Sequence, residues 1–170
     1  MTLEEAIKTA LEFERKVRDS YQTASNKASD PTARKVLKVF ADEEAGHVAY
    51  LHARLEEWRK TGHVTSATLN TAIPSRERIA AGVAKLQAGI DRERPTTEDL
   101  AAFRRALDVE REASGFYKKM VAELPAEGQR LFARFVEIEE GHLAMAQAEI
   151  DAANGLGFWF DVQEFRLEAG

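Results

Sequence analysis

Four long stretches of the chain carry apolar residues at every third or fourth position, which is the pattern of helices that bury one face. Local signals bound these stretches. Thr2 and Glu5 form a capping-box pattern, and Asp30 before Pro31 combines a preferred N-cap with proline at the first helical position. Gly62 is expected to end the second stretch. The predicted helices run over residues 2–28, 31–60, 96–124 and, after a turn around 125–128, as far as 153.

The connections between the predicted helices are short, long and short. The long one, from His63 to Pro95, contains a predicted short helix at 77–87. This order is typical of two antiparallel helix hairpins joined by one crossover. The expected fold class is therefore all-α, a four-helix bundle over residues 1–155. An aromatic tail at 156–170 follows and is expected to pack on the bundle or to form a dimer interface.

Composition and charge exclude several classes of protein. The net charge of −5 disfavours a nucleic-acid binder, which needs a basic surface to meet phosphates. No apolar run approaches the length of a membrane span, and the acidic N-terminus lacks the features of a signal peptide. The absence of cysteine removes disulfides, thiol catalysis and cysteine-ligated metals. We therefore expect a cytoplasmic protein with no nucleic-acid or membrane partner.

Each apolar seam is interrupted at its middle by a glutamate, and two of the seams add a histidine three positions later. Ionised carboxylates are strongly unfavourable in an apolar core, and four converging glutamates would also repel one another. Two divalent cations would cancel the four negative charges, and two neutral imidazoles would complete their shell. The sequence therefore predicts a dimetal site in the core. Its candidate ligands are Glu14, Glu44, His47, Glu110, Glu139 and His142.

The two halves of the chain repeat this pattern. Glu14 is followed seven positions later by Tyr21, and Glu110 is followed at the same interval by Tyr117. Each half then carries a Glu-x-Gly-His motif, at 44–47 and at 139–142. One Glu plus one Glu-x-x-His from each half is the ligand set of ferritin-like dimetal bundles. The competing interpretation, solvated glutamates and merely buried histidines, would require both motifs to fall on apolar seams and in register by chance.

Two other features of the repeat have alternative interpretations. Tyr21 and Tyr117 are either hydrogen-bond partners of the ligating carboxylates or ordinary core tyrosines. Gly46 and Gly141 each precede a candidate ligand histidine, where glycine costs about 1 kcal/mol relative to alanine in a helix. They indicate either close packing of small residues or an access path to the metals.

With these motifs the chain resembles the rubrerythrin group of the ferritin-like superfamily, over about residues 3–153. The resemblance rests on the glutamates, the two Glu-x-x-His motifs and the two tyrosines. It implies two irons inside a ferritin-like four-helix bundle. By this resemblance Glu14 and Glu110 are terminal carboxylates, Glu44 and Glu139 are bridging carboxylates, and His47 and His142 each bind one iron.

The chain departs from the rubrerythrin pattern in two places. A full rubrerythrin carries a cysteine-ligated rubredoxin module that supplies electrons, and this chain has no cysteine. The reductant is therefore expected to be a separate partner, such as a rubredoxin-like protein. Family members also carry a further carboxylate three residues after the terminal one on the third helix. Here that position is Ala113, and the neighbouring Glu112 points elsewhere on a helix.

The resemblance implies a di-iron oxidoreductase that reduces hydrogen peroxide with electrons from the external donor, in a homodimer. One alternative is a ferroxidase that oxidises Fe(II) with dioxygen and handles the product. A second alternative is a non-redox structural bundle that holds zinc or no metal, although zinc sites rarely use four carboxylates and two histidines. Manganese accepts the same oxygen and nitrogen ligands as iron, so either metal is compatible with the ligand set.

Overall fold

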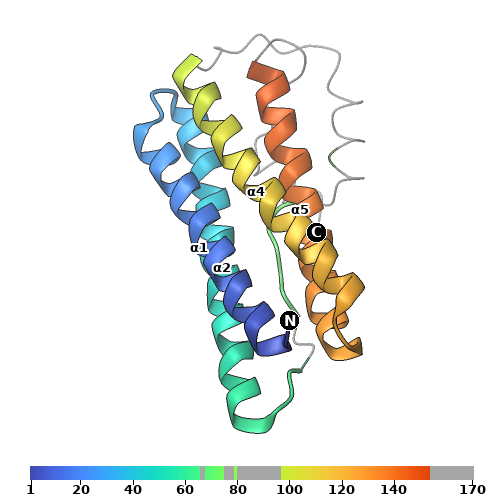
Figure 1. Cartoon of the computed structure of the whole chain (residues 1–170). Coiled ribbons are helices and arrows are strands. Elements are labelled where there is room, and N and C mark those ends of the chain that lie inside the picture. The colour runs from blue at the N-terminus through green and yellow to red at the C-terminus, as the bar shows by residue number, and fades with distance from the viewer. Residues whose placement is uncertain (66–67, 75–78, 80–96, 154–170) are drawn as a thin grey trace, which may run out of the picture.

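The computed structural model describes residues 1–65, 68–74, 79 and 97–153. These residues form four long helices and no strand: α1 (Leu3–Lys27), α2 (Pro31–Thr61), α4 (Thr97–Glu123) and α5 (Ala126–Ala153) (Figure 1). The predicted all-α four-helix bundle is confirmed. The aromatic tail, residue 96 at the expected start of the third helix, and all but one residue of the helix expected at 77–87 lie outside the described residues.

The capping signals place the helix ends where the sequence predicts them. The Thr2 hydroxyl accepts a hydrogen bond from the Glu5 amide at 3.2 Å, and the Glu5 carboxylate accepts one from the Thr2 amide at 2.8 Å. At the start of α2, Asp30 Oδ1 accepts from the Ala33 amide at 2.7 Å. Gly62 ends α2 with φ of 74°, a left-handed conformation that glycine adopts without steric cost.

The start of α5 differs from the prediction. The helix begins at Ala126, so Gly128 lies in its first turn and not in the preceding connection. The Gln129 amide already donates to the Pro125 carbonyl at 3.0 Å, as it does in a helix. A Cβ at position 128 would lie 2.8 Å from Leu124 Cδ1, so this glycine makes room for a side chain of the preceding helix end.

The helices form two antiparallel hairpins that pack side by side. α1 packs along α2, α4 packs along α5, and α1 also contacts α4 (Figure 1). The space between the hairpins is filled by apolar side chains and a group of aromatic rings. Among the described residues, the fully buried aromatic ones are Tyr21, Phe40, Phe103, Tyr117, Phe132 and Phe135. None of the described helices is both long and apolar enough to span a membrane.

The described part of the crossover leaves α2 at Gly62 and runs back along the bundle (green in Figure 1). Its buried apolar side chains are Val64, Leu69 and Ile73. Arg134 of α5 donates from Nε to the Leu69 carbonyl at 3.1 Å. Further along, the Pro74 carbonyl packs directly on Gly141, where a Cβ would lie 2.8 Å from the carbonyl oxygen. The crossover is thereby fixed against α5 close to the middle of the bundle.

Candidate metal centre

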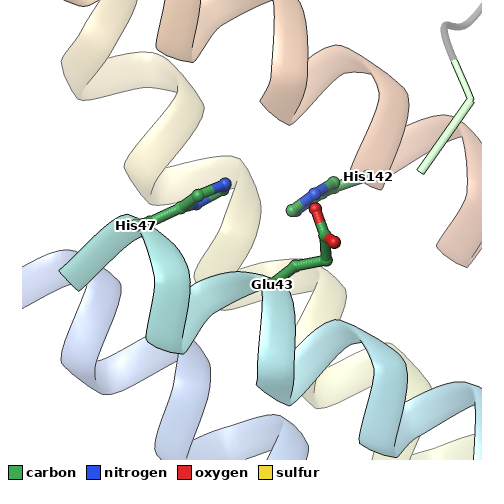
Figure 2. Close-up of side chains that lie close together, drawn as sticks. All are labelled: Glu43, His47 and His142. Atoms are coloured by element: carbon green, nitrogen blue, oxygen red, sulfur yellow. The ribbon is translucent and has the colours of Figure 1, made fainter. Parts of the chain in front are cut away.

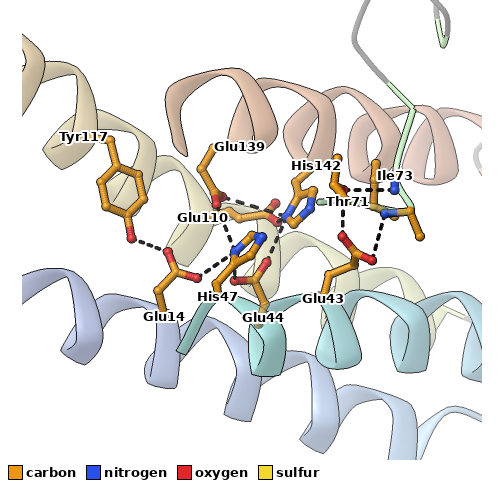
Figure 3. Close-up of polar contacts among 11 residues, drawn as sticks. Glu14, Glu43, Glu44, His47, Thr71, Ile73, Glu110, Tyr117, Glu139 and His142 are labelled. Carbon is orange, nitrogen blue, oxygen red and sulfur yellow. Dashed lines mark hydrogen bonds and ion pairs between the residues drawn. The ribbon is translucent and has the colours of Figure 1, made fainter. Parts of the chain in front are cut away.

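The four helices bring all six predicted ligands together at the middle of the core (Figure 3). α1 and α4 each supply one glutamate, and α2 and α5 each supply a glutamate and a histidine one helical turn further on. None of the six side chains is more than 1% exposed. They are Glu14, Glu44, His47, Glu110, Glu139 and His142. Six polar side chains therefore lie together at the centre of a core that is mainly apolar.

The six residues divide into two sets of four that share two members. In one set Glu14 and His47 join Glu44 and Glu139, with donor atoms within 4.8 Å of one another. The other set contains the same two shared glutamates together with Glu110 and His142, within the same limit. Carboxylates have two oxygens, so Glu44 and Glu139 are each able to contact both positions. Two adjacent cation positions with two shared carboxylates follow from this arrangement.

At the first position, three carboxylates surround His47 Nδ1. It lies 2.9 Å from Glu14 Oε2, 3.1 Å from Glu44 Oε2 and 3.5 Å from Glu139 Oε1. The nitrogen and oxygens belong to helices α1, α2 and α5. One half of the bundle alone would therefore not complete this position.

The second position repeats the first from the other hairpin. His142 Nδ1 lies 2.8 Å from Glu44 Oε1, 3.3 Å from Glu110 Oε1 and 3.9 Å from Glu139 Oε2. The rings of His47 and His142 are parallel within 9°, with centroids 5.3 Å apart. The shared glutamates present one oxygen to each imidazole, which places the two positions side by side between the rings.

Many polar atoms of the site are buried without a hydrogen-bond partner among the described residues. They include both oxygens of Glu110, both oxygens of Glu139 and both ring nitrogens of His142. Several lie close to one another without hydrogen-bond alignment, as His142 Nδ1 does beside Glu44 Oε1 at 2.8 Å. Buried polar atoms without partners are costly and are rare in native proteins. Oxygen and nitrogen lone pairs that converge on shared points fit divalent cations, which would satisfy them together.

In the metal-free state, protons replace cations at the carboxyls. Burial, aided by the charge on Glu44, raises the pKa of Glu14 from 4.5 to about 8. Burial and the charges on Glu44 and Glu14 also raise the pKa of Glu139 well above its ordinary value. Burial alone would raise the pKa of Glu44 as well. The charge on His47 and the hydrogen bonds that neighbouring side chains make to the Glu44 carboxylate outweigh burial and hold its pKa well below 4.5.

The imidazoles also hold protons in the metal-free state. Burial acts to lower the pKa of His47, but the charges and hydrogen bonds of Glu44 and Glu14 raise it well above 6.5. The pKa of His142 is also raised well above 6.5 against the effect of burial, by the nearby carboxylates of Glu110, Glu44 and Glu139. Because metals bind neutral imidazole and ionised carboxylate, cations must displace these protons to enter.

The tyrosine of one repeat reaches the glutamate of the other. The Tyr117 hydroxyl of α4 donates a hydrogen bond to Glu14 Oε1 of α1 (Figure 3). The Tyr21 hydroxyl of α1 is buried and has no hydrogen-bond partner among the described residues. Burial and the charge of Glu110 raise the pKa of Tyr21 well above 10. The structure therefore shows one of the two tyrosine–carboxylate bonds that the sequence left open.

The position of the further carboxylate in rubrerythrins is buried but apolar here. Ala113 is fully buried in α4. Glu112 points to the surface, where its carboxylate pairs with Lys16 at 2.9 Å and remains 59% exposed. The described site therefore has four core carboxylates and gains no fifth from this part of α4.

Sequence reasoning missed one residue that the structure places beside the site. Glu43 lies on α2 immediately before Glu44, and one of its oxygens groups with ring nitrogens of His47 and His142 within 4.8 Å (Figure 2). The signal was present in the repeat, because the equivalent residue of the second half is Ile138. Where one half of a repeat has a glutamate and the other half has a buried apolar residue, the glutamate is expected to have a role specific to its own half.

The two glycines beside the histidines have different surroundings. Gly141 is explained by the close approach of the Pro74 carbonyl, which is packing against the crossover. A Cβ at Gly46 would meet no atom within 4 Å among the described residues, and nothing in the structure explains this glycine. The two histidines outside the seams, His52 and His63, lie at the surface away from the centre.

No protein-family model, no curated protein and no solved structure matches this chain. The function therefore has to be inferred from the chemistry and geometry of the residues themselves.

Proposed function

We propose that this chain is a di-iron oxidoreductase that reduces hydrogen peroxide with electrons from an external donor. The observation that carries the proposal is the pair of four-residue donor sets that share Glu44 and Glu139. A single structural cation needs no second set, and a solvated acidic cluster would not be buried. Shared carboxylates in a dry core are the arrangement that holds two cations next to one another.

The donor set favours iron. Carboxylate oxygens and imidazole nitrogens suit iron and manganese, whereas structural zinc sites are built mainly from cysteine and histidine in tetrahedral sets. Carboxylates also change between bridging and terminal binding as the charge of a metal changes, which suits a centre that cycles between Fe(II) and Fe(III). Manganese satisfies the same ligands, so metal analysis of the purified protein is required to identify the native ion.

Each protein group has a separate part in the proposed reaction. Glu14 and Glu110 hold one position each, Glu44 and Glu139 hold both, and the aromatic core excludes bulk water. The chemistry that a bound iron pair supplies is the transfer of two electrons, one from each Fe(II), which with two protons converts hydrogen peroxide into two waters. The chain has no cysteine for a rubredoxin-type iron site of its own, so the two electrons must return from a separate donor.

Ferroxidase activity is the second candidate, and one observation favours it. Rubrerythrins use an additional carboxylate on the third helix in peroxide chemistry, and Ala113 occupies that position here. With four core carboxylates the centre would oxidise Fe(II) with dioxygen and release the product. The two candidates share the metal centre and differ in the oxidant.

Metal binding under anaerobic conditions tests the centre that both candidates require. Wild type is expected to bind two Fe(II) per chain and to gain thermal stability as it does so. Glu44→Ala is expected to lose both ions because Glu44 serves both positions, whereas Glu14→Ala is expected to retain one. Glu140→Ala is the matched control, since this glutamate follows Glu139 on α5 but pairs with Lys118 at the surface. Two tightly bound irons in Glu44→Ala would refute the site.

An oxidant competition separates the two candidates. The Fe(II) protein is mixed rapidly with hydrogen peroxide or with dioxygen at equal concentration, and oxidation is followed by near-ultraviolet absorption. Faster oxidation by peroxide supports the peroxide reductase. Faster oxidation by dioxygen supports the ferroxidase, and no oxidation by either leaves the non-redox bundle.

A further inference from the structure

Glu43 stands beside the candidate metal centre without belonging to the six core ligands. Its side chain is half-buried on α2, one helical turn before His47 and therefore on the same side of the helix. One of its oxygens and a ring nitrogen of each of His47 and His142 lie within 4.8 Å of one another (Figure 2). Among the residues that the structure describes, Glu43 is thus the carboxylate outside the core set that groups with both histidines.

The crossover holds the Glu43 carboxylate in place. Thr71 donates from its hydroxyl to Oε2 at 2.6 Å, and the Ala72 amide donates to Oε1 at 2.9 Å (Figure 3). The Thr71 hydroxyl itself accepts from the Ile73 amide at 3.0 Å, which fixes its orientation. Each carboxylate oxygen accepts one of these bonds and retains capacity for another donor. Glu43 is therefore oriented by the crossover but is not saturated by it.

The two imidazoles each have a ring nitrogen that lacks a hydrogen-bond partner, and Glu43 is able to accept such a bond. Both rings direct Nδ1 at the core carboxylates, at distances of 2.9 Å for His47 and 2.8 Å for His142. Both Nε2 atoms are buried without a hydrogen-bond partner among the described residues. An imidazole that binds a metal through Nδ1 carries its proton on Nε2, and metal-ligating histidines nearly always donate that N–H to a carboxylate, a carbonyl or water.

We propose that Glu43 accepts the Nε2–H groups of the metal-bound His47 and His142 and so positions both rings for coordination through Nδ1. Glu43 acts through the histidines and is a positioning residue. Because Thr71 and Ala72 hold it, the crossover is part of the outer support of the centre. This inference rests on the metal centre proposed above, but it does not depend on iron or on redox activity.

The experiment compares Glu43→Gln and Glu43→Ala with a matched control, Glu57→Gln. Glu57 also lies on α2 and also ties down the crossover, by accepting the Thr65 amide at 3.1 Å and the Thr65 hydroxyl at 3.3 Å. It belongs to none of the metal-binding groups among the described residues. Loss of a crossover tie is common to all three variants, and loss of an acceptor for the histidines is confined to position 43.

Cobalt(II) is the probe, because it accepts the same ligands as iron and shifts the proton resonances of bound imidazole far from the protein envelope. Wild type is expected to show two shifted, solvent-exchangeable N–H resonances, one for each histidine. In Glu43→Ala these protons are expected to exchange at least about tenfold faster, and cobalt affinity is expected to fall by about 10- to 100-fold. Glu43→Gln retains one acceptor oxygen and is expected to lie between, and Glu57→Gln is expected to match wild type.

Three results would overturn the inference. Exchange and affinity in Glu43→Ala equal to those of Glu57→Gln would show that Glu43 only ties the crossover. A third cobalt ion per chain that is lost in Glu43→Gln would show that Glu43 is itself a metal ligand. Absence of shifted resonances in wild type would refute the metal centre together with this inference, whereas intact resonances with an unchanged Glu43→Ala would refute the inference alone.

Discussion

The metal-free protein is expected to become less stable as the pH rises from 5 to 7, opposite to the behaviour of a protein stabilised by ionised carboxylates. The cause is the raised pKa of the buried core carboxyls. The pKa of Glu14 is about 8 in the folded chain against 4.5 for an ordinary glutamate, and that of Glu139 is also raised well above 4.5. Between pH 5 and 7 the unfolded chain has released the Glu14 proton and the folded chain has kept it. Proton binding therefore favours the folded state less as the pH rises.

The magnitude follows from the linkage relation. A group that is protonated only in the folded state costs about 1.4 kcal/mol of unfolding free energy for each unit rise in pH, or about 2.7 kcal/mol from pH 5 to 7. This amount for Glu14 alone is a substantial part of the whole stability of a small domain, and the raised pKa of Glu139 acts in the same direction. Glu44 has a lowered pKa, so its contribution is lost only as the pH falls through the folded value, below this window.

The histidines extend the same trend to higher pH. The pKa values of His47 and His142 are raised well above 6.5, so their contribution to stability is fully present below 6.5. It is lost as the pH rises through their folded-state values. Stability of the metal-free chain is therefore expected to continue to fall above pH 7.

Urea unfolding with a strong chelator present, at pH values from 5 to 8, measures this slope. Glu14→Gln removes one titrating group without a large change in volume, and its slope between pH 5 and 7 is expected to be shallower by about 1.4 kcal/mol per pH unit. Glu140→Gln, on the surface beside Lys118, is the control and is expected to keep the wild-type slope. A stability that is flat or rises over this range, or an unchanged slope in Glu14→Gln, would refute the assigned protonation of the core.

Three further predictions concern residues of the repeat. Gly141→Ala is expected to destabilise the chain by about 1–3 kcal/mol because the new Cβ would meet the Pro74 carbonyl oxygen at 2.8 Å. Gly46→Ala meets no described atom within 4 Å and is expected to stabilise it by about 0.5–1 kcal/mol; equal urea midpoints for the two variants would contradict this reasoning. Tyr117→Phe removes the hydrogen bond to Glu14 and is expected to cost about 1 kcal/mol in the metal-free chain. An unfolding free energy equal to wild type would show that this bond makes no net contribution.

The helices could be predicted because their boundaries are set by local chemistry. Thr2 and Glu5 satisfy each other's backbone amides, and Gly62 provides the left-handed residue that ends α2. These signals act within a few residues and depend little on the rest of the fold. The start of α5 was misplaced because Gly128 looks like a turn residue, whereas its function is to make room for Leu124.

The six core residues could be predicted for a related reason. An ionised carboxylate is unfavourable in an apolar core, so a glutamate on an apolar helix face is conspicuous in the sequence. Such a glutamate occurs near the middle of all four predicted helices. Glu43 was missed because it is not among the apolar-seam positions that Glu44 and its equivalents interrupt, and its importance depends on where the crossover lies. The contacts with Thr71 and Ala72 are tertiary, and no periodicity in the sequence encodes them.

The crossover also explains why two halves with the same ligand chemistry are not equivalent. The repeat duplicates the Glu-x-Gly-His motif, but the described part of the crossover contacts the two copies differently, through Glu43 beside the first and Gly141 in the second. Pro74 packs on Gly141 and leaves Gly46 open, and Glu43 occupies the place that Ile138 fills in the other half. Identical donor atoms in unlike surroundings bind cations with unlike affinity, because outer contacts fix ligand orientation. The two positions of the centre are therefore expected to fill in sequence and not together.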